Sequence, residues 1–320
     1  MKYFKLLYLT ILCELILFSG ILMPYTYISS VRYIGAENSL ITFSDSIDGI
    51  YINPVSSVYV PYTSDLNIGY SKLNRSLTWL NVIGGIKFKN IGIGLGMVNQ
   101  SASDLNRIDN NGVIIGDSTF YHREYILNGA LKLNNLLLGC NIKSITYKFD
   151  YYSKKLLTIE PGSILFLKKN WFIGVVGKNF SLDNPIIIYA LGKSFNTKRP
   201  EGLNSMFKSS DNEYGDSELE EIIEENKNTF FSLPPKNKIN IELDLHQNLT
   251  DYSFDYLSTG IEWWLIESIC LRSGFSYNIK YKNITFASGI TIIIKRFKIE
   301  YAYKNTDIFG SHFFNLGILF

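Results

Sequence analysis

The last ten residues, Ser311–Phe320, read Ser-His-Phe-Phe-Asn-Leu-Gly-Ile-Leu-Phe. In steps of two, Phe314, Leu316, Ile318 and Phe320 share one face of this stretch, a period that indicates a β-strand. About ten residues is also the length of a tilted strand that crosses a bilayer. This stretch alone leaves two hypotheses open: the closing strand of a transmembrane β-barrel and the edge strand of a soluble all-β domain.

The same alternation recurs along the chain from about Leu66, in segments of roughly ten residues separated by turns. Many of the polar faces carry Glu, Asp, Lys and Asn, which need a wet lumen or a solvent side. We therefore predict an all-β fold, a transmembrane antiparallel β-barrel of about fourteen strands, with a soluble sandwich as the alternative. The predicted strands are Leu66–Leu73, Leu77–Phe88, Ile91–Val98, Tyr121–Leu133, Leu136–Phe149, Lys154–Phe166, Trp171–Phe180, Pro185–Ser194, Lys236–His246, Phe254–Ile266, Ser268–Ile279, Asn283–Ile294, Phe297–Tyr303 and Ser311–Phe320.

Two kinds of connection separate these strands. The short periplasmic turns are expected at Asn90, Asn134-Asn135, Lys168–Asn170 and Lys295-Arg296. A longer extracellular loop is expected at Asn99–Phe120, because Asp109-Asn110-Asn111-Gly112 is a turn signal.

The composition agrees with a membrane barrel. Aromatic residues make up 15% of the chain and charged residues only 19%. This balance is too apolar for an ordinary soluble surface and too evenly spread for a helical membrane protein. A net charge of +2 gives no basic footprint for nucleic acid.

The N-terminal region, residues 1–30, resembles a secretory signal peptide, with Lys2 and Lys5 followed by an apolar run from Leu6 to Met23. A single anchoring helix and a lipid on Cys13 are the alternatives. Export followed by a barrel at residues 31–320 predicts a location in the outer membrane. Cys140 and Cys270 fall in different predicted strands, and their pairing is left open.

One connection does not fit a barrel easily. Asn196–Pro235 is about forty residues long, and the parity of the strands places it on the periplasmic side, where turns are short. It is rich in Asp and Glu, and Leu219, Ile222 and Ile223 have helical spacing. It is interpreted as a solvated acidic loop (196–235), with partner docking or divalent-cation binding as the functional alternatives.

Enzymatic motifs are lacking in the sequence. The three histidines, His122, His246 and His312, are scattered over separate predicted strands without Ser-His-Asp or metal-ligand spacing. We expect no enzyme, no cofactor and no metal site. The glycines of 92–96 alternate with apolar residues, so we interpret them as a strand face that leaves room for another segment to approach the wall.

The segment before the first strand, residues 31–63, contains the run 35–55. Ser44 or Asp45 can cap a short turn of helix there, and Asn53-Pro54 ends it. Both a buried plug and an ordinary lead-in have this pattern.

The run 35–55 resembles the N-terminal signature of PorV/PorQ-type outer-membrane proteins and of the wider FadL-like family of long-chain fatty-acid transporters. Further similar stretches follow in order down the chain. They are 109–112, 138–143, 173–179, 233–235, 260–264, 271–277 and the closing pair from Glu300 to Phe320. Val55 in place of the usual alanine, and one acid rather than two around Asp45, depart from the pattern.

The resemblance implies a barrel with the N-terminal segment folded into its lumen. It offers two functions: import of hydrophobic small molecules such as long-chain fatty acids past a plug that must shift, or a non-transporting PorV-like barrel that binds a partner protein through 196–235. The expected plug and ligand contacts are Phe43, Asp45, Ile47, Ile50, Tyr51, Asn53 and Pro54.

Three further residues carry predictions. Glu262 and Arg272 are expected to face the lumen as a structural ion pair, with recognition of a fatty-acid carboxylate by Arg272 as the alternative. The resemblance implies that Phe320 is recognised by the outer-membrane assembly machinery, while outer-membrane lipid surrounds the barrel.

Overall fold

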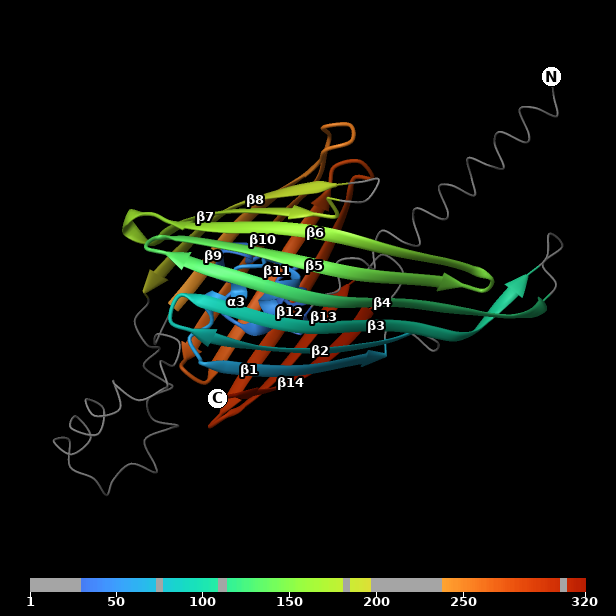
Figure 1. Cartoon of the computed structure of the whole chain (residues 1–320), viewed down its shortest axis with the longest axis horizontal. Helices are drawn as coiled ribbons and strands as arrows, with labels where there is room; N and C mark the ends of the chain where they lie inside the picture. The colour runs from blue at the N-terminus through green and yellow to red at the C-terminus, as the bar shows by residue number, and fades with distance from the viewer. Residues whose placement is uncertain (1–29, 73–76, 109–113, 181–184, 197–237, 306–309) are drawn as a thin grey trace.

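The computed structural model describes residues 30–72, 77–108, 114–180, 185–196, 238–305 and 310–320. Fourteen antiparallel strands form one closed barrel, in which each strand pairs with its neighbours in sequence and β1 pairs with β14 (Figure 1). The fourteen-strand prediction is confirmed. The strands are β1 Ser64–Lys72, β2 Leu77–Phe88, β3 Ile91–Ile108, β4 Ile114–Leu133, β5 Leu136–Phe149, β6 Tyr152–Phe166, β7 Trp171–Lys178, β8 Ile186–Asn196, β9 Lys238–Asn248, β10 Phe254–Ile266, β11 Ile269–Asn278, β12 Asn283–Ile294, β13 Phe297–Asn305 and β14 Gly310–Leu319.

The C-terminal stretch closes the barrel. The Phe320 N–H donates to the Ser64 carbonyl at 3.0 Å, and the Ser64 N–H donates to the Phe320 carbonyl at 3.3 Å. Phe314 is 55% exposed on the outer face, whereas Phe313 is 1% exposed in the lumen. The two faces predicted from the sequence of this strand are therefore the lipid side and the lumen side of the wall.

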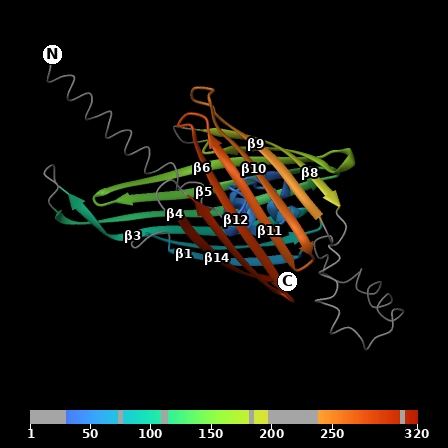
Figure 2. The ribbon, with the colours of Figure 1, turned by 180° about the vertical axis from the view of Figure 1, so that it is seen from behind.

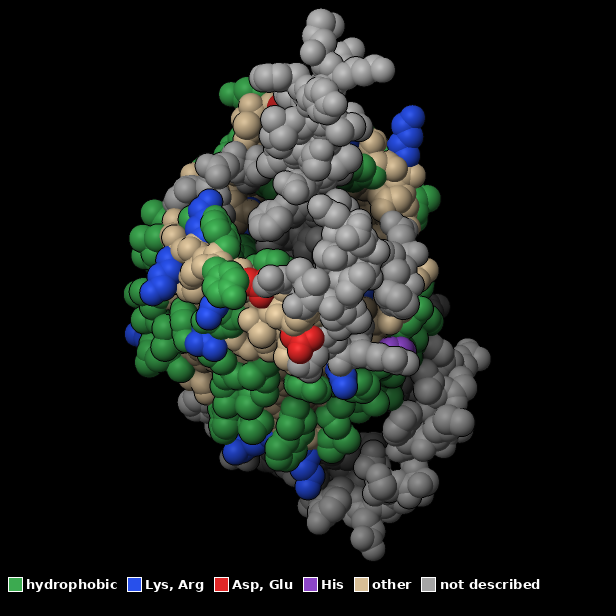
Figure 3. All heavy atoms as spheres, turned by 90° about the vertical axis from the view of Figure 1, so that its right-hand side faces the viewer, with side chains coloured by type: hydrophobic (Ala, Val, Ile, Leu, Met, Phe, Trp, Pro, Cys, Tyr) green, Lys and Arg blue, Asp and Glu red, His purple; other side chains and the backbone are tan. Residues whose placement is uncertain are grey.

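The outer surface of the barrel is apolar. Leu and Ile side chains are exposed on strand after strand, in a belt bordered by aromatic residues, as a lipid-facing wall requires. Figure 3 shows these apolar side chains around the barrel, viewed from the right-hand end of Figure 1. Members at the end with the short turns include Phe88, Trp171, Phe195, Trp263 and Phe297, and at the other end Tyr70, Tyr125, Tyr189, Phe286 and Phe314.

One predicted loop is wrong. Most of 99–120 is strand, because β3 continues to Ile108 and β4 begins at Ile114. These strand extensions are rich in polar residues, so no regular apolar alternation marks them in the sequence. The β3–β4 and β5–β6 hairpins extend beyond the others at the right of Figure 1. Elsewhere the observed and predicted strand ends agree within two residues, and β2, β5, β10 and β12 match exactly.

The short turns lie where they were predicted, between β2 and β3, β4 and β5, β6 and β7, and β12 and β13. Asn134 and Lys295 adopt left-handed backbone there, with φ of 52° and 55°. The antiparallel order places the end of β8 and the start of β9 at this same end, as strand parity predicts. The predicted signal peptide, except Ser30, and the acidic loop, except Asn196, lie outside the described residues.

No helix within the described residues is long and apolar enough to span a membrane. The described helical elements are short. One turn, η3 Lys168–Asn170, lies between β6 and β7. Four others precede β1: α2 Val31–Ile34, η1 Ile41–Phe43, η2 Ile47–Tyr51 and α3 Ser56–Tyr59. Figure 2, from behind, shows this blue segment enclosed by β8 to β12 as well.

Candidate functional site in the plugged lumen

The segment 31–63, here called the plug, lies inside the barrel (Figures 1 and 2). From Ser30 to Val60 every residue is buried except Asn38, Asp45 and Tyr59, which are half-buried. Its helical turns are three to five residues long, too short to be stable alone. The wall must therefore hold the plug in shape.

Inward-facing glycines let the plug backbone approach the wall closely. A Cβ added to Gly139 on β5 would lie 2.5 Å from the Pro54 carbonyl carbon, and one on Gly35 would lie 3.1 Å from the Gly289 Cα. On β3, a Cβ on Gly94 would lie 3.2 Å from Ile50. The predicted role of the β3 glycines is confirmed. Other wall glycines that face the plug are Gly85, Gly92, Gly162, Gly174, Gly192, Gly260 and Gly274.

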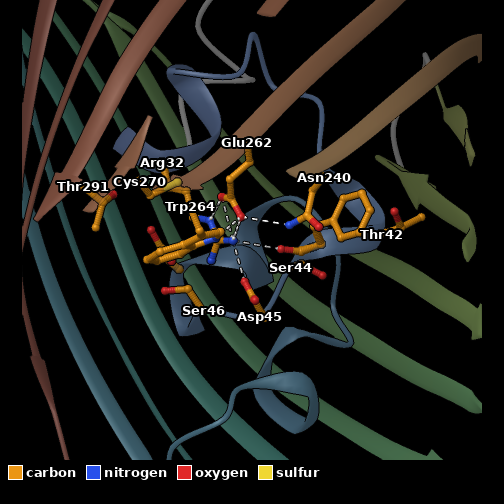
Figure 4. Close-up of polar contacts among 12 residues, drawn as sticks. Arg32, Thr42, Ser44, Asp45, Ser46, Asn240, Glu262, Trp264, Cys270 and Thr291 are labelled. Atoms are coloured by element: carbon orange, nitrogen blue, oxygen red, sulfur yellow. Dashed lines mark hydrogen bonds and ion pairs between the residues drawn. The ribbon is translucent and has the colours of Figure 1, made fainter. Parts of the chain in front are cut away.

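Arg32 of α2 ties the first half of the plug to the wall. Its Nη2 lies 2.5 Å from Asp45 Oδ1 and 2.9 Å from Glu262 Oε2, and its Nε donates to Glu262 at 3.0 Å. Arg32 Nη2 also donates to the Phe43 carbonyl at 3.2 Å. Figure 4 shows Arg32 and Glu262 at the centre of this group. One buried guanidinium thus fixes both the fold of the plug and its attachment to β10.

Glu262 and Arg272 form the predicted lumen ion pair. They are directly opposite each other on β10 and β11, and Arg272 Nε donates to Glu262 Oε2 at 2.8 Å. Glu262 also accepts hydrogen bonds from Asn240 at 3.1 Å and from the Trp264 indole at 2.9 Å. The Arg272 guanidinium is already paired with Glu262 of the wall, so binding of a ligand carboxylate to Arg272 requires that this ion pair break.

A second anchor of the same half joins Asp48 to β13. Lys298 Nζ lies 3.9 Å from Asp48 Oδ1 and donates to Ser46 Oγ at 2.7 Å, and the Ser30 hydroxyl donates to Asp48. Burial by itself raises the pKa of the Asp48 carboxyl, but the Lys298 ammonium and the serine hydroxyl donors outweigh burial and hold this pKa below its usual value. Asp48 is therefore an ionised anchor in the lumen.

The second half of the plug is held through its backbone instead. Asn141 on β5 donates to the Ile50 carbonyl at 2.7 Å, Asn128 on β4 donates to the Pro54 carbonyl at 2.7 Å, and Lys178 on β7 donates to the Tyr51 carbonyl at 2.6 Å. Buried carbonyls need such partners. In these three contacts the wall supplies the polar side chain and the plug supplies a main-chain carbonyl.

Lys178 belongs to a row of charges across four strands. Its Nζ lies 3.0 Å from Glu160 on β6, Glu160 lies 2.8 Å from Lys143 on β5, and Lys143 lies 3.7 Å from Glu124 on β4. His122 Nε2 lies 3.0 Å from Glu124. All are buried in the lumen. The row positions the Lys178 ammonium under the plug.

Apolar residues of the plug pack on the wall in several places. The largest of these clusters runs continuously from the plug onto β2, β3, β4, β13 and β14, and includes the edge-to-face pair Trp79 and Phe313, whose ring centres are 5.9 Å apart. We call it the apolar track. Its buried members are Val31, Ile34, Ile47, Ile50, Tyr51, Val60, Leu77, Trp79, Ile83, Val98, Ala102, Ile126, Ala302 and Phe313.

The structure places the predicted plug residues against the wall or against each other. Phe43 stacks edge-on against Phe172 at 5.1 Å, and the Tyr51 hydroxyl donates to the Met97 carbonyl at 3.2 Å. Asn53 donates to the Ile41 carbonyl at 3.2 Å, which closes the plug on itself. Their contact with a ligand stays a prediction.

Sequence reasoning missed the anchors Arg32, Asp48, Lys178 and Lys298. A signal for Arg32 was available, since an arginine in a segment destined for the lumen needs a carboxylate partner. For Lys298 and Glu300 the signal was alternation, since both follow an apolar residue of the strand and so belong on the face opposite Phe297 and Ile299. Only the closed barrel shows which charges meet.

Two small cavities lie between plug and wall. One of about 30 Å³ is bordered by Arg32, Arg272 and Lys298, and one of about 20 Å³ by Tyr51 and Lys178. Each has room for about one or two water molecules. The described residues contain no cluster of three His, Cys, Asp or Glu that could hold a metal ion. Cys140 and Cys270 are free and are not paired.

No protein-family model and no curated protein matches this chain. Solved structures share its architecture. The CymD monoaromatic hydrocarbon channel matches with a TM-score of 0.56 at 10% identity, over 90% of this chain and 96% of that one. The P. putida toluene transporter TodX matches with 0.54 at 10% identity, over 86% and 94%. These likenesses show the fold, an outer-membrane type of barrel, and leave the narrower resemblance to PorV/PorQ-type proteins a prediction.

Proposed function

We propose that this chain is an outer-membrane channel that admits small hydrophobic molecules. The observation that carries the proposal is the apolar track. It joins Leu77, Trp79 and Phe313, which lie toward the end opposite the short turns, to Ile47 and Ile50 of the plug. A hydrophilic-solute channel has a polar, water-filled interior, whereas this side of the lumen is aromatic and aliphatic. The fold shared with the two hydrocarbon channels supports the same cargo class.

Aromatic hydrocarbons and long-chain fatty acids are both candidates for the cargo. A hydrocarbon needs only the apolar track. A fatty acid also needs a cation, and Arg32, Arg272 and Lys298 border the cavity of about 30 Å³. These cations are paired with plug and wall carboxylates, so the head group of a fatty acid would have to displace one of them.

The two cavities beside the plug at Arg272 and at Lys178 each have room for about one or two water molecules, so passage of a larger molecule there needs movement in the lumen. We propose that the plug shifts, with Phe43, Ile47, Ile50 and Tyr51 as apolar ligand contacts. Partner binding through the acidic loop, the PorV-like alternative, stays a prediction because that loop lies outside the described residues.

The test is uptake by cells that lack their own transporter of this class, with labelled toluene and labelled oleate offered separately. Expression of the full chain should raise the uptake rate of at least one of them above that of empty-vector cells. Trp79→Gln, which places an amide in the apolar track, should lower the rate, and Trp79→Phe should keep it. Equal uptake by all strains, at equal levels of heat-modifiable barrel, would refute the proposal.

A further inference from the structure

The outer face of β4, β5 and β6 carries three basic side chains close together. Arg123 on β4 and Lys155 on β6 are both directly opposite Thr146 of β5, and Lys148 lies two residues farther along β5. With adjacent strands about 4.8 Å apart and diagonal neighbours about 7–8 Å apart, the three form a triangle around Thr146. We call these residues the basic triangle.

The basic triangle faces outward. Its neighbours in sequence, Glu124 and Ile145, are buried in the lumen, whereas Lys148 and Lys155 are exposed and Arg123 is half-buried. Figure 3 shows basic side chains gathered on the side of the barrel that faces the viewer in Figure 1, where β3 to β6 lie.

The triangle also lies at one border of the apolar belt. Arg123 is ten residues from Leu133 at the short-turn end of β4, and a tilted strand crosses a bilayer in about 9–11 residues. On the same outer face, toward the short turns, the wall is apolar and exposed: Leu127 (52%), Ile142 (44%), Leu157 (62%) and Ile159 (47%). The basic triangle thus borders these four exposed apolar residues, which we call the apolar stripe, on the side away from the short turns.

Within the wall the arginine is held in position and the lysines are not. Arg123 donates to Asn99 at 3.2 Å, and its guanidinium lies 4.8 Å from the centre of the Tyr121 ring. Among the described residues, no carboxylate forms an ion pair with the triangle. Asp150, two residues beyond Lys148, accepts hydrogen bonds from Ser118 at 2.9 Å and from the Thr119 N–H at 3.3 Å.

We propose that the basic triangle binds the phosphate monoester of a membrane lipid in the leaflet opposite the short turns, with the lipid's acyl chains along the apolar stripe. Three cations match a phosphate monoester of about −1.5 to −2 better than a singly charged diester. Arg can bind a phosphate through two hydrogen bonds, Lys binds it as a point charge, and Thr146 adds a hydroxyl donor. The stripe selects a lipid over a free phosphate ion.

This inference needs the barrel to lie in a bilayer but does not need it to transport anything. Loss of lipid binding and loss of uptake are therefore separate outcomes. A lipid held here would cover the outer face of the β3–β6 wall, the part of the barrel that extends farthest beyond the others.

The experiment uses the full chain in phosphatidylcholine nanodiscs, titrated with lipid A that carries two phosphates, with bound lipid counted by native mass spectrometry. The variant R123Q/K148Q/K155Q should bind lipid A about 100-fold more weakly, since each basic side chain contributes. The control K193Q/K280Q/K282Q removes the same charge elsewhere and should stay within about twofold of the parent.

Three results would overturn the proposal. They are equal binding by the triangle variant and the parent, equal binding of dephosphorylated lipid A, and competition by inorganic phosphate at the same concentration as lipid A. Should the triple variant fail to give a heat-modifiable barrel, K148Q and K155Q replace it singly. Each of these exposed lysines should weaken binding about fivefold, and unchanged binding by both would equally overturn the proposal.

Discussion

The two halves of the plug are held in opposite ways. The first half, 30–48, uses its own charged side chains, since Arg32 and Asp48 reach Glu262 and Lys298 in the wall. The second half, 49–60, offers backbone carbonyls to wall side chains such as Asn141. The first half thus depends on charged side chains of the plug, and the second half on polar side chains of the wall, while wall glycines let the main chain of both halves approach.

This difference predicts where substitutions act. In the first half, a change in the plug should release it. In the second half, a change in the wall should release it, while plug side chains matter less. For each prediction below, hydrogen exchange of residues 30–63 measures the free energy of plug opening separately from unfolding of the barrel.

The largest effect is expected for Arg32→Ala. It removes the guanidinium that pairs with Asp45 and leaves Glu262 with Arg272 as its remaining cation, and breaking a buried ion pair on one side costs about 3–5 kcal/mol. Exchange in 30–48 should speed up accordingly while the strands stay protected. Arg296→Ala, at a short turn, is the control of equal charge change. Unaltered exchange in 30–48 would show that Arg32 is not an anchor.

Gly139→Val should come next, and it tests the second half through the wall. The new side chain meets the backbone of Pro54, which cannot rotate away, so the cost is about 3 kcal/mol, the upper end for overpacking. Gly129→Val on the adjacent strand is the matched control, because a Cβ there meets nothing within 4 Å. Equal exchange in the two variants would show that the Pro54 main chain does not pack closely against Gly139.

Asn141→Ala should have a smaller effect, about 1 kcal/mol. It removes the donor to the Ile50 carbonyl, and the cavity that results can admit a water that replaces part of the hydrogen bond. Faster exchange should be confined to 49–60. Faster exchange at Arg32 and its neighbours instead would mean that the two halves open together.

The smallest effect is expected for Ser57→Ala in α3. The Ser57 hydroxyl is fully buried and has no hydrogen-bond partner among the described residues. Removing it should leave the opening free energy unchanged or raise it by about 1 kcal/mol. A clear loss of protection would contradict the view that plug side chains in this half contribute little.

Much of this architecture could be predicted from the sequence. The fourteen strands could be predicted from alternation, because apolar residues of a barrel wall face lipid and polar residues face the lumen. The extensions of β3 and β4 escaped detection because their many polar residues interrupt the apolar alternation. The Glu262–Arg272 pair was predicted because both are inward-facing charges on consecutive strands.

The contacts that anchor the plug to the wall could not be predicted from the sequence. Arg32 meets Glu262 across 230 residues of sequence, and Lys178 meets the Tyr51 carbonyl across 127. Local pattern carries no information about such pairs. The basic triangle depends in the same way on the register of three strands, which sets Arg123 and Lys155 on either side of Thr146.

The sequence by itself thus determined the strands, their faces and the closing role of Ser311–Phe320, because these follow from a period of two and from the chemistry of lipid and water. Only the tertiary structure decided which charge faces which, where the plug touches the wall, and where cations gather above the apolar stripe. Those contacts depend on the closure and register of the barrel, in which residues far apart along the chain become neighbours.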